Sequence, residues 1–318
     1  MLSIFIQLNF AILSIVSLNV IQIKEASYMF DVKDLMFTYP KNKEATIKGI
    51  SFDIKKGEIF GFLGPSGAGK STTQKLLLKL LSGATGDIRF NGTSILELKS
   101  SFYESIGVSF EMPIHFTKMT AYENIRFFQD LYEKKADIET LMTRVGLWKD
   151  KDKLISEYSK GMKIRLNIVR ALINQPVMLF LDEPTNGLDP KNAMILKDMI
   201  REYRDQGGTV FITSHIMSDI EQLCDRVAFI VDGKIVELSS PRDLKIQYGE
   251  KVIKVEYIEN GKKLDQTFDM TLKDSKKALS QFILDHDIET IHSGETTLED
   301  IFIKVTGVSL KAPETHDA

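Results

Sequence analysis

The stretch GPSGAGKST decides the fold of this 318-residue chain; it comprises Gly64, Pro65, Ser66, Gly67, Ala68, Gly69, Lys70, Ser71 and Thr72. The apolar run EIFGFL precedes it, and the helical pattern STTQKLLLKLL overlaps its end and continues to residue 81. This order of strand, glycine-rich loop and helix is the context in which the pattern G-x-x-x-x-G-K-[ST] binds nucleotide phosphates. Glycines let backbone N–H groups wrap the phosphates, and the helix N-terminus adds positive potential. We therefore expect a nucleoside triphosphate site in which Lys70 reaches the β- and γ-phosphates and Ser71 offers its hydroxyl to Mg²⁺.

A second motif, VMLFLDEP at residues 177–184, places two carboxylates at the end of an apolar strand. Ligands of open α/β sheets bind at the carboxyl ends of strands. Asp182 suits Mg²⁺, directly or through water, and Glu183 is placed to polarise an attacking water. Each motif alone has a plainer interpretation, a glycine-rich turn or an acidic turn. Their occurrence in one chain favours a hydrolytic nucleotide site.

Around these motifs, strand and helix patterns alternate. Strand patterns occupy 29–39 and 49–60, and a hairpin with an Asn91-Gly92 turn occupies 87–95. Residues 96–170 are mostly helical by pattern, and apolar strands follow at 177–182, 208–214 and 226–237, with a helix at 190–206. Strands alternating with helices predict a parallel α/β sheet that is buried on both faces. After residues 241–249, a hairpin turning at Asn260-Gly261, a helix, a strand and a last helix predict a small α+β tail.

The composition is that of a globular protein, with 43% apolar and 27% charged residues. Its length allows about two domains. The formal net charge of −3 gives no general reason to expect nucleic acid or anionic lipid as a partner. Cys224 is the only cysteine, which excludes an internal disulfide framework and fits a reducing compartment. The five histidines are scattered, and no Cys/His spacing indicates a metal site.

A third motif, YSKGMKIRL at Tyr158–Leu166, lies just before the Asp182 strand. It is similar to the LSGGQ signature of ABC transporters, and from about Met29 to Pro241 the chain resembles their ATP-binding subunits. The resemblance implies a P-loop NTPase fold with a RecA-like parallel sheet core, an antiparallel β subdomain and a helical subdomain. It places an ATP-binding domain at residues 29–245 and a C-terminal extension at 246–318.

The resemblance also implies roles for single residues. Ser159 and Gly161 match signature positions that, in the family, contact the ATP held by the other protomer, whereas Lys160 and Met162 depart from the pattern. From its residues alone, Ser159 is equally a helix N-cap. Asp189 matches the loop that links the two ATP sites.

His215, at the end of the next strand, matches the histidine that contacts the γ-phosphate. Tyr39 matches the aromatic residue that stacks on adenine, although a tyrosine at a strand end can also pack on the core. Glu111 stands where the family has glutamine, and we predict that it is a Mg²⁺ ligand because a carboxylate can replace the amide. The segment from Met112 to Phe128 matches the permease-docking region, unless its aromatic side chains are subdomain core.

The resemblance implies a motor subunit that binds and hydrolyses ATP with Mg²⁺. It pairs with a second ATP-binding subunit and drives separate permease subunits at the cytoplasmic face of the membrane. Glu111, the YSKGM sequence and the C-terminal extension resemble exporters of drugs, antibiotics and lipids. The alternatives are a soluble ABC ATPase acting on ribosomes or DNA and a non-hydrolysing regulatory module. One phosphate loop and no sustained heptads disfavour the first; retention of Lys70, Asp182, Glu183 and His215 disfavours the second.

The first 23 residues contain no charged side chain, and about 20 apolar residues suffice to cross a bilayer. Polar residues interrupt this segment, and no basic region precedes it as in a secretory signal. Two interpretations remain for residues 1–28. They are an N-terminal anchor, or they are upstream translation with Met29 as the working start, which we favour because the cassette pattern begins there.

Overall fold

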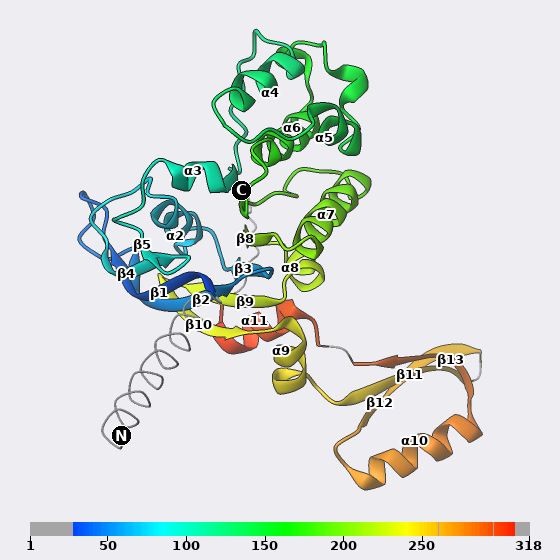
Figure 1. Ribbon diagram of the computed structural model, residues 1–318. Helices are drawn as coiled ribbons and strands as arrows, with labels where there is room; N and C mark the ends of the chain where they lie inside the picture. The colour runs from blue at the N-terminus through cyan, green and yellow to red at the C-terminus, as the bar shows by residue number, and fades with distance from the viewer. Residues whose placement is uncertain (1–27, 260, 295, 309–318) are drawn as a thin grey trace, which may run out of the picture. The chain divides into compact units, whose positions relative to one another are not determined.

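The computed structural model describes residues 28–259, 261–294 and 296–308. The predictions for the apolar N-terminal segment, for Asn260 and for the last residues fall outside these ranges. The chain divides into two compact units, with the boundary between Leu238 and Ser239 (Figure 1). Among the described residues, no helix has both the length and the apolarity to span a membrane.

The first unit is built on a six-stranded sheet with the order β10-β9-β3-β8-β7-β6. The strands are β3 (Ile59–Leu63), β6 (Ile106–Ser109), β7 (Met178–Asp182), β8 (Thr209–Ser214), β9 (Arg226–Val231) and β10 (Lys234–Ser239). The pairs β3–β8, β3–β9, β7–β8 and β6–β7 are parallel. Every residue of β3, β7 and β8 is buried. The predicted parallel sheet, covered on both faces, is therefore confirmed.

A four-stranded antiparallel sheet with the order β2-β1-β4-β5 packs on this core. Its strands are β1 (Tyr28–Phe37), β2 (Ile47–Lys55), β4 (Thr85–Phe90) and β5 (Thr93–Ser94). Asn91 and Gly92 both have positive φ, 49° and 83°, as a type I′ hairpin turn requires, which confirms the predicted turn. Phe30 meets Phe180 edge-to-face at 5.8 Å, so aromatic contacts join the two sheets.

Helix α2 (Lys70–Leu77) follows the phosphate loop and ends one turn earlier than predicted. Lys79 has a φ of 58°, and the Leu80 amide donates to the Lys75 carbonyl at 2.9 Å, which closes the helix. The Lys79 ammonium donates to the Leu98 carbonyl at 2.6 Å. A lysine thus takes the left-handed position usually held by glycine, so the sequence pattern gave no sign of this helix end.

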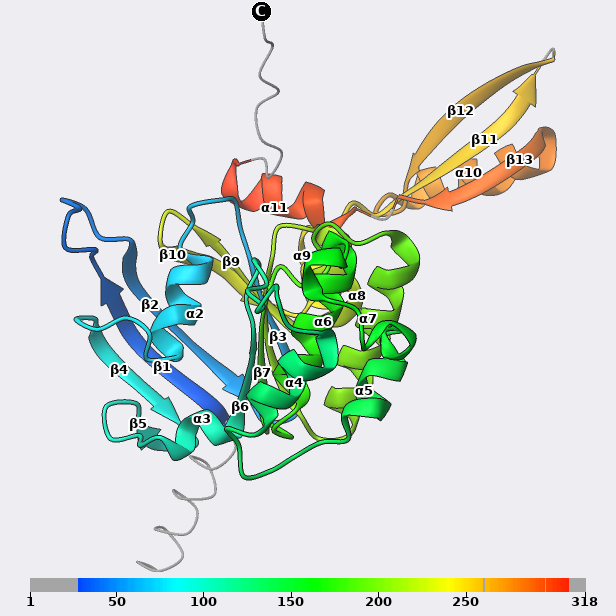
Figure 2. The same cartoon turned by 90° about the horizontal axis from the view of Figure 1, so that it is seen from above.

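Apart from α3, the remaining helices of this unit form two groups, which Figure 1 shows apart, and Figure 2 shows both groups on the side of the parallel sheet away from β1, β2 and β4. The helical subdomain contains α4 (Ala121–Gln129), α5 (Ile138–Arg144), α6 (Lys160–Leu172) and the 3₁₀ turns Trp148–Asp150 and Ile155–Glu157; α3 (Ser101–Ser105) leads into β6. Helices α7 (Pro190–Asp205) and α8 (Met217–Leu223) contact each other and β8. The helix predicted at 190–206 is confirmed.

The second unit contains a three-stranded antiparallel sheet with the order β12-β11-β13. Its elements are α9 (Pro241–Tyr248), β11 (Val252–Glu259), β12 (Lys262–Asp269), α10 (Lys273–Asp285), β13 (Asp287–Ser293) and α11 (Leu298–Thr306). Val255, Phe268 and Leu279 form its small core. The α+β tail predicted from the sequence is therefore confirmed.

Candidate active site

The phosphate loop joins the end of β3 to the start of α2. Gly64 lies so close to β9 that an added Cβ would stand 2.1 Å from the Ile230 carbonyl oxygen, which only glycine avoids. Gly69 precedes the helix with a φ of 108°, and the first turn of α2 contains no acidic residue. The helix start thus keeps its positive potential for an anion.

Lys70 lies within this loop and is 8% exposed. Its ammonium donates to the Gly64 carbonyl at 2.6 Å and to the Pro65 carbonyl at 3.1 Å, and lies 4.0 Å from a Glu183 oxygen. Burial lowers the pKa of Lys70, and the charges of Glu183 and Asp182 partly oppose this shift. The ammonium is thus held at the loop by backbone carbonyls, where phosphate oxygens would be stronger partners.

Asp182 ends strand β7 opposite the start of α2. Its Oδ1 accepts from Ser71 Oγ at 3.3 Å and from the Thr213 hydroxyl, and its residue is 7% exposed. Parallel pairing sets Asp182 beside Thr213. A hydroxyl and a carboxylate oxygen therefore face one another, and oxygen ligands of this kind suit Mg²⁺. Among the described residues, no three His, Cys, Asp or Glu side chains gather as a metal cluster, so phosphate oxygens and water would complete this site.

Glu183 follows Asp182 and has a φ of 49°, a left-handed conformation that is uncommon outside glycine. Its Oε2 accepts from Ser214 Oγ and from the His215 amide, both at 3.2 Å. The other carboxylate oxygen lies 2.9 Å from His215 Nδ1. Glu183 is 8% exposed, whereas 44% of the His215 side chain is exposed. A buried carboxylate therefore stands between the lysine of the phosphate loop and a solvent-facing histidine.

The structure thus gathers Lys70, Ser71, Asp182, Glu183 and His215 at the carboxyl ends of β3, β7 and β8. Sequence reasoning missed Thr213 and Ser214, which orient the two carboxylates. The sequence clue to these two residues was that the otherwise apolar strand ends in two hydroxyl side chains, in the stretch FITS. Which carboxylate each hydroxyl meets depends on the register between β7 and β8.

Glu111 lies on the loop after β6 and is exposed. Its Oε1 accepts from Asn186 Nδ2 at 3.4 Å. This contact joins the loop of Glu111 to the loop that follows Glu183. Its role as a Mg²⁺ ligand stays a prediction.

The loop that carries Glu111 is fastened to helix α6. Asn167 Nδ2 donates to Ser109 Oγ at 2.8 Å and to the Phe110 carbonyl at 3.0 Å. Arg170 donates to the Ile114 carbonyl at 2.6 Å and to Asn167 Oδ1 at 2.6 Å. The loop is therefore tied by hydrogen bonds to α6, the helix that Ser159 caps.

Tyr39 follows β1 and is half-buried. Its ring meets Phe37 edge-to-face at 4.9 Å, and its hydroxyl lies 3.3 Å from Thr72 Oγ1. It thus lies against the core, as the plainer interpretation expects, and also beside the phosphate loop. Stacking on adenine stays a prediction.

Ser159 and Asp189 both cap helices. Ser159 Oγ accepts from the Met162 amide at 3.3 Å at the start of α6, and Asp189 Oδ1 accepts from the Asn192 amide at 3.0 Å at the start of α7. Hydrogen bonds from Asn192 lower the pKa of Asp189. Both residues are exposed, and Gly161 is half-buried in the first turn of α6. Among the described residues, the side chains of Ser159 and Asp189 make no hydrogen bond or ion pair with Lys70, Glu183 or His215.

Comparison with known proteins shows to which family the chain belongs. A profile described as ABC transporter matches residues 47–186. The chain is 48% identical over 281 residues to a fluoroquinolones export ATP-binding protein of Mycobacterium tuberculosis, a match that covers 88% of this chain and 93% of the relative. The chain belongs to the ABC transporter family.

Other members of the family extend this comparison. The chain is 32% identical over 303 residues to the bacitracin transport ATP-binding protein BcrA of Bacillus licheniformis, covering 88% of this chain and 98% of the relative. A solved ATP-binding subunit of an ABC transporter has a TM-score of 0.64 and 26% identity, covering 70% of this chain and 93% of that one. A dimeric bacterial ABC transporter cassette shares the fold, with a TM-score of 0.62 and 23% identity over 67% of this chain and 98% of that chain.

The P-loop NTPase fold expected from the sequence is confirmed. The chain is an ATP-hydrolysing motor subunit of an ABC transporter.

Proposed function

We propose that two copies of this chain enclose ATP between the phosphate loop of one copy and Ser159 of the other, and that Glu183 is the base for hydrolysis. The observation that carries the proposal is the position of the Glu183 carboxylate, buried between Lys70 and His215 at the edge of the sheet. From there it can accept a proton from a water that attacks the γ-phosphate.

The other residues hold the reactants in place. Lys70 exchanges its backbone carbonyl partners for phosphate oxygens, and the start of α2 binds the same charge through its N–H groups. Ser71 and Asp182, 3.3 Å apart, would hold Mg²⁺, with Glu111 as a further ligand. When bound, Mg²⁺ neutralises charge that develops on the phosphate oxygens. His215 donates to the γ-phosphate while its Nδ1 side stays at Glu183.

Three further contacts complete the proposed nucleotide site. Tyr39, beside Thr72, stacks on the adenine ring. Ser159 and Gly161, in the first turn of α6, contact the ATP of the other copy. Asp189, at the start of α7, links the two sites.

A membrane permease is the proposed partner, and it docks on the segment from Met112 to Phe128 and the adjoining Leu131. Met112, Ile114 and Leu131 are 78%, 79% and 65% exposed, and Phe116 and Phe127 are nearly half exposed. Tyr122 and Phe128 are half-buried and belong partly to the subdomain core. This concentration of exposed apolar side chains suits a protein partner.

The transport direction proposed is export, at the cytoplasmic face of the membrane. The named relatives act in fluoroquinolones export and bacitracin transport, and both are matched over nearly their whole length. We propose a substrate of the same broad class, a drug or antibiotic.

The test of the proposed site is Glu183→Gln. This change keeps the shape of the side chain and removes the base, so ATP binding should persist while turnover falls roughly 10²–10⁴-fold. ATP should also trap a dimer, which size-exclusion chromatography can detect. Turnover close to that of the unchanged protein would remove Glu183 from the role of base.

A further inference from the structure

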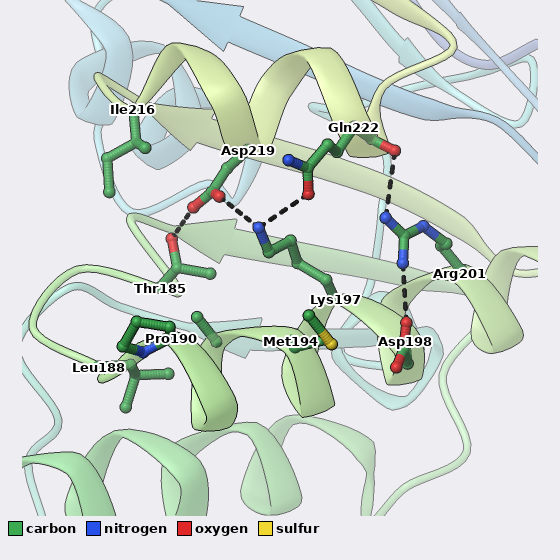
Figure 3. Close-up of a pocket in the computed structure, with 11 residues that line it drawn as sticks. Thr185, Leu188, Pro190, Met194, Lys197, Asp198, Arg201, Ile216, Asp219 and Gln222 are labelled. Atoms are coloured by element: carbon green, nitrogen blue, oxygen red, sulfur yellow. Dashed lines mark hydrogen bonds and ion pairs between the residues drawn. The ribbon is translucent and has the colours of Figure 1, made fainter.

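We propose that Asp219 is a positioning residue for the Glu183–His215 pair and that it acts through Thr185 (Figure 3). The proposal rests on the proposed roles of Glu183 and His215. Asp219 touches neither of them. It lies on α8, the helix that follows His215, and reaches the loop that follows Glu183.

One carboxylate joins three segments of the chain. Its Oδ2 accepts from the Thr185 hydroxyl, two residues after Glu183. Its Oδ1 accepts from Lys197 Nζ on α7 at 2.8 Å, and the same ammonium reaches Gln222 Oε1 on α8 at 3.0 Å. Figure 3 shows Lys197 extending from α7 to α8, with Thr185 on the other side of the carboxylate.

These segments are the supports of the catalytic pair. Glu183 and Thr185 share the loop between β7 and α7, and His215 lies between β8 and α8. The Glu183 carboxylate must meet the His215 amide and ring, so both loops must keep their separation. Glu183 also has a left-handed backbone, a conformation that persists only when its surroundings hold it. The hydrogen bond between Thr185 and Asp219 provides such support, because it fixes the Glu183 loop to α8.

The bond is shielded from water. Asp219 and Thr185 are each 5% exposed, and the Lys197 side chain is 13% exposed. Hydrogen bonds in such surroundings are strong and directional, and the ammonium balances the buried carboxylate. Loss of the Thr185 hydroxyl would therefore release the Glu183 loop while the Lys197–Asp219 ion pair stays in place.

A pocket lined by Thr185, Lys197 and Asp219 provides a matched control. It has a volume of about 470 Å³ and also contains the ion pair between Arg201 and Asp198, at 2.8 Å. These side chains are 36% and 56% exposed, and the pair lies within α7. Removing this pair alters the pocket and leaves the Thr185–Asp219 contact intact.

The experiment compares Thr185→Val, Thr185→Ser and Asp198→Asn in the full-length chain. Valine has the shape of threonine without the hydroxyl, and we expect kcat to fall about 10- to 100-fold, as for a catalytic group that is misplaced. The KM for ATP should stay within about twofold, because the phosphate loop is untouched. Serine restores the hydroxyl and should restore kcat, and Asp198→Asn should leave both constants unchanged.

A double-mutant cycle separates positioning from general damage. If Thr185 acts through Glu183, Thr185→Val should reduce the residual turnover of Glu183→Gln by less than about twofold, because the affected base is already gone. An equal reduction in both backgrounds would overturn the inference. So would a Thr185→Val protein with unchanged kcat, or one that serine fails to rescue.

The same variants distinguish failure of the proposed base from failure of the proposed positioning residue. If Glu183→Gln keeps its turnover, the assignment of the base is wrong. If Glu183→Gln is inactive and Thr185→Val is fully active, only the positioning role of Asp219 is wrong.

Discussion

On helix α2, the side-chain amide of Gln74 is buried. The residue is 1% exposed, and within the part of the chain that the structure describes neither Nε2 nor Oε1 has a hydrogen-bond partner. A buried polar group without a partner costs about 1–3 kcal/mol of folding free energy. At the scale of one residue, the buried amide of Gln74 therefore lowers the free energy of unfolding.

Gln74→Met should raise the melting temperature. Methionine keeps the unbranched shape and removes both polar atoms. A gain of about 1–2 kcal/mol corresponds to roughly 2–8 °C for a unit of this size. The matched control is Gln129→Met, because Gln129 is also buried but donates to the Ala136 carbonyl at 2.7 Å. The control should melt at a lower temperature. A Gln74→Met protein that melts no higher than the unchanged chain would mean that a water or a rearranged partner satisfies the amide.

His115 makes stability depend on pH. Burial lowers its pKa to about 4, and the nearby charges of Arg170 and Lys163 lower it as well. Its Nε2 donates to the Lys163 carbonyl at 3.1 Å, which requires only the neutral ring. Between about pH 6.5 and 4, the unfolded chain binds a proton at this residue and the folded chain does not. The stability that the neutral ring contributes is therefore present above pH 6.5 and is lost as the pH falls through this window.

His115→Gln should remove part of this acid sensitivity. Glutamine can still donate to the Lys163 carbonyl and cannot be protonated. Urea unfolding at pH 7.5 and pH 5 should show a smaller loss of stability for the variant than for the unchanged chain. Equal losses would mean that His115 is protonated as easily when folded as when unfolded.

The catalytic side chains could be predicted from the sequence, whereas their partners could not. Asp182 ends an apolar strand, Glu183 and His215 come directly after one, and the loop that carries Lys70 follows another. Parallel strands bring their carboxyl ends to one edge of the sheet. Thr213 and Ser214 meet Asp182 and Glu183 through the register of β7 and β8. Register depends on packing of the whole sheet, which no local pattern in these strands encodes.

At the scale of elements, helix α6 carries two parts of the proposed ATP site. Its first turn follows Ser159, and its middle holds the loop of Glu111 through Asn167 and Arg170. Asn167 is 1% exposed, and all its side-chain bonds lie within this network. The helix therefore connects the loop of Glu111 to Ser159, the residue that caps its first turn.

Asn167→Leu should loosen the loop from Phe110 to Phe116. The change removes three side-chain hydrogen bonds, one from Arg170 and two to Ser109 and Phe110. At about 0.5–1.5 kcal/mol each, loss of the two at Ser109 and Phe110 should speed amide exchange in this loop by roughly tenfold or more. Asn174→Leu is the control, because Asn174 is equally buried and donates instead to the carbonyls of Glu104 and Ile106. It should lower stability without selective exchange at 110–116. The same exchange pattern in both variants would contradict a specific link to α6.

The elements themselves were largely predictable, with exceptions at their ends. The Asn91-Gly92 turn could be predicted from the sequence because both residues favour positive φ. The end of α2 was not, because Lys79 takes the left-handed position and depends on a contact with the distant Leu98 carbonyl. Patterns report local preferences, and this helix end is set by a tertiary contact.

At the scale of the whole molecule, the proposed ATP site is spread over one unit of the chain, from Tyr39 to His215. The phosphate loop, Asp182, Glu183 and His215 meet at one edge of the sheet, while Ser159 and Asp189 are exposed helix caps. The central claim of the proposed function is that a second copy provides the missing contacts. The sequence predicted this arrangement only by resemblance to the family.

The most direct measurement mixes two inactive proteins, Lys70→Ala and Ser159→Arg. Each alone forms dimers in which both sites are defective. In a mixed dimer, the phosphate loop of the Ser159→Arg copy meets the intact Ser159 of the other copy. ATP hydrolysis should then recover to about one quarter of that of the unchanged protein, because random pairing of a symmetric dimer leaves one site in four intact. A mixture that hydrolyses no more ATP than the two separate proteins would contradict the claim that ATP is held between two copies.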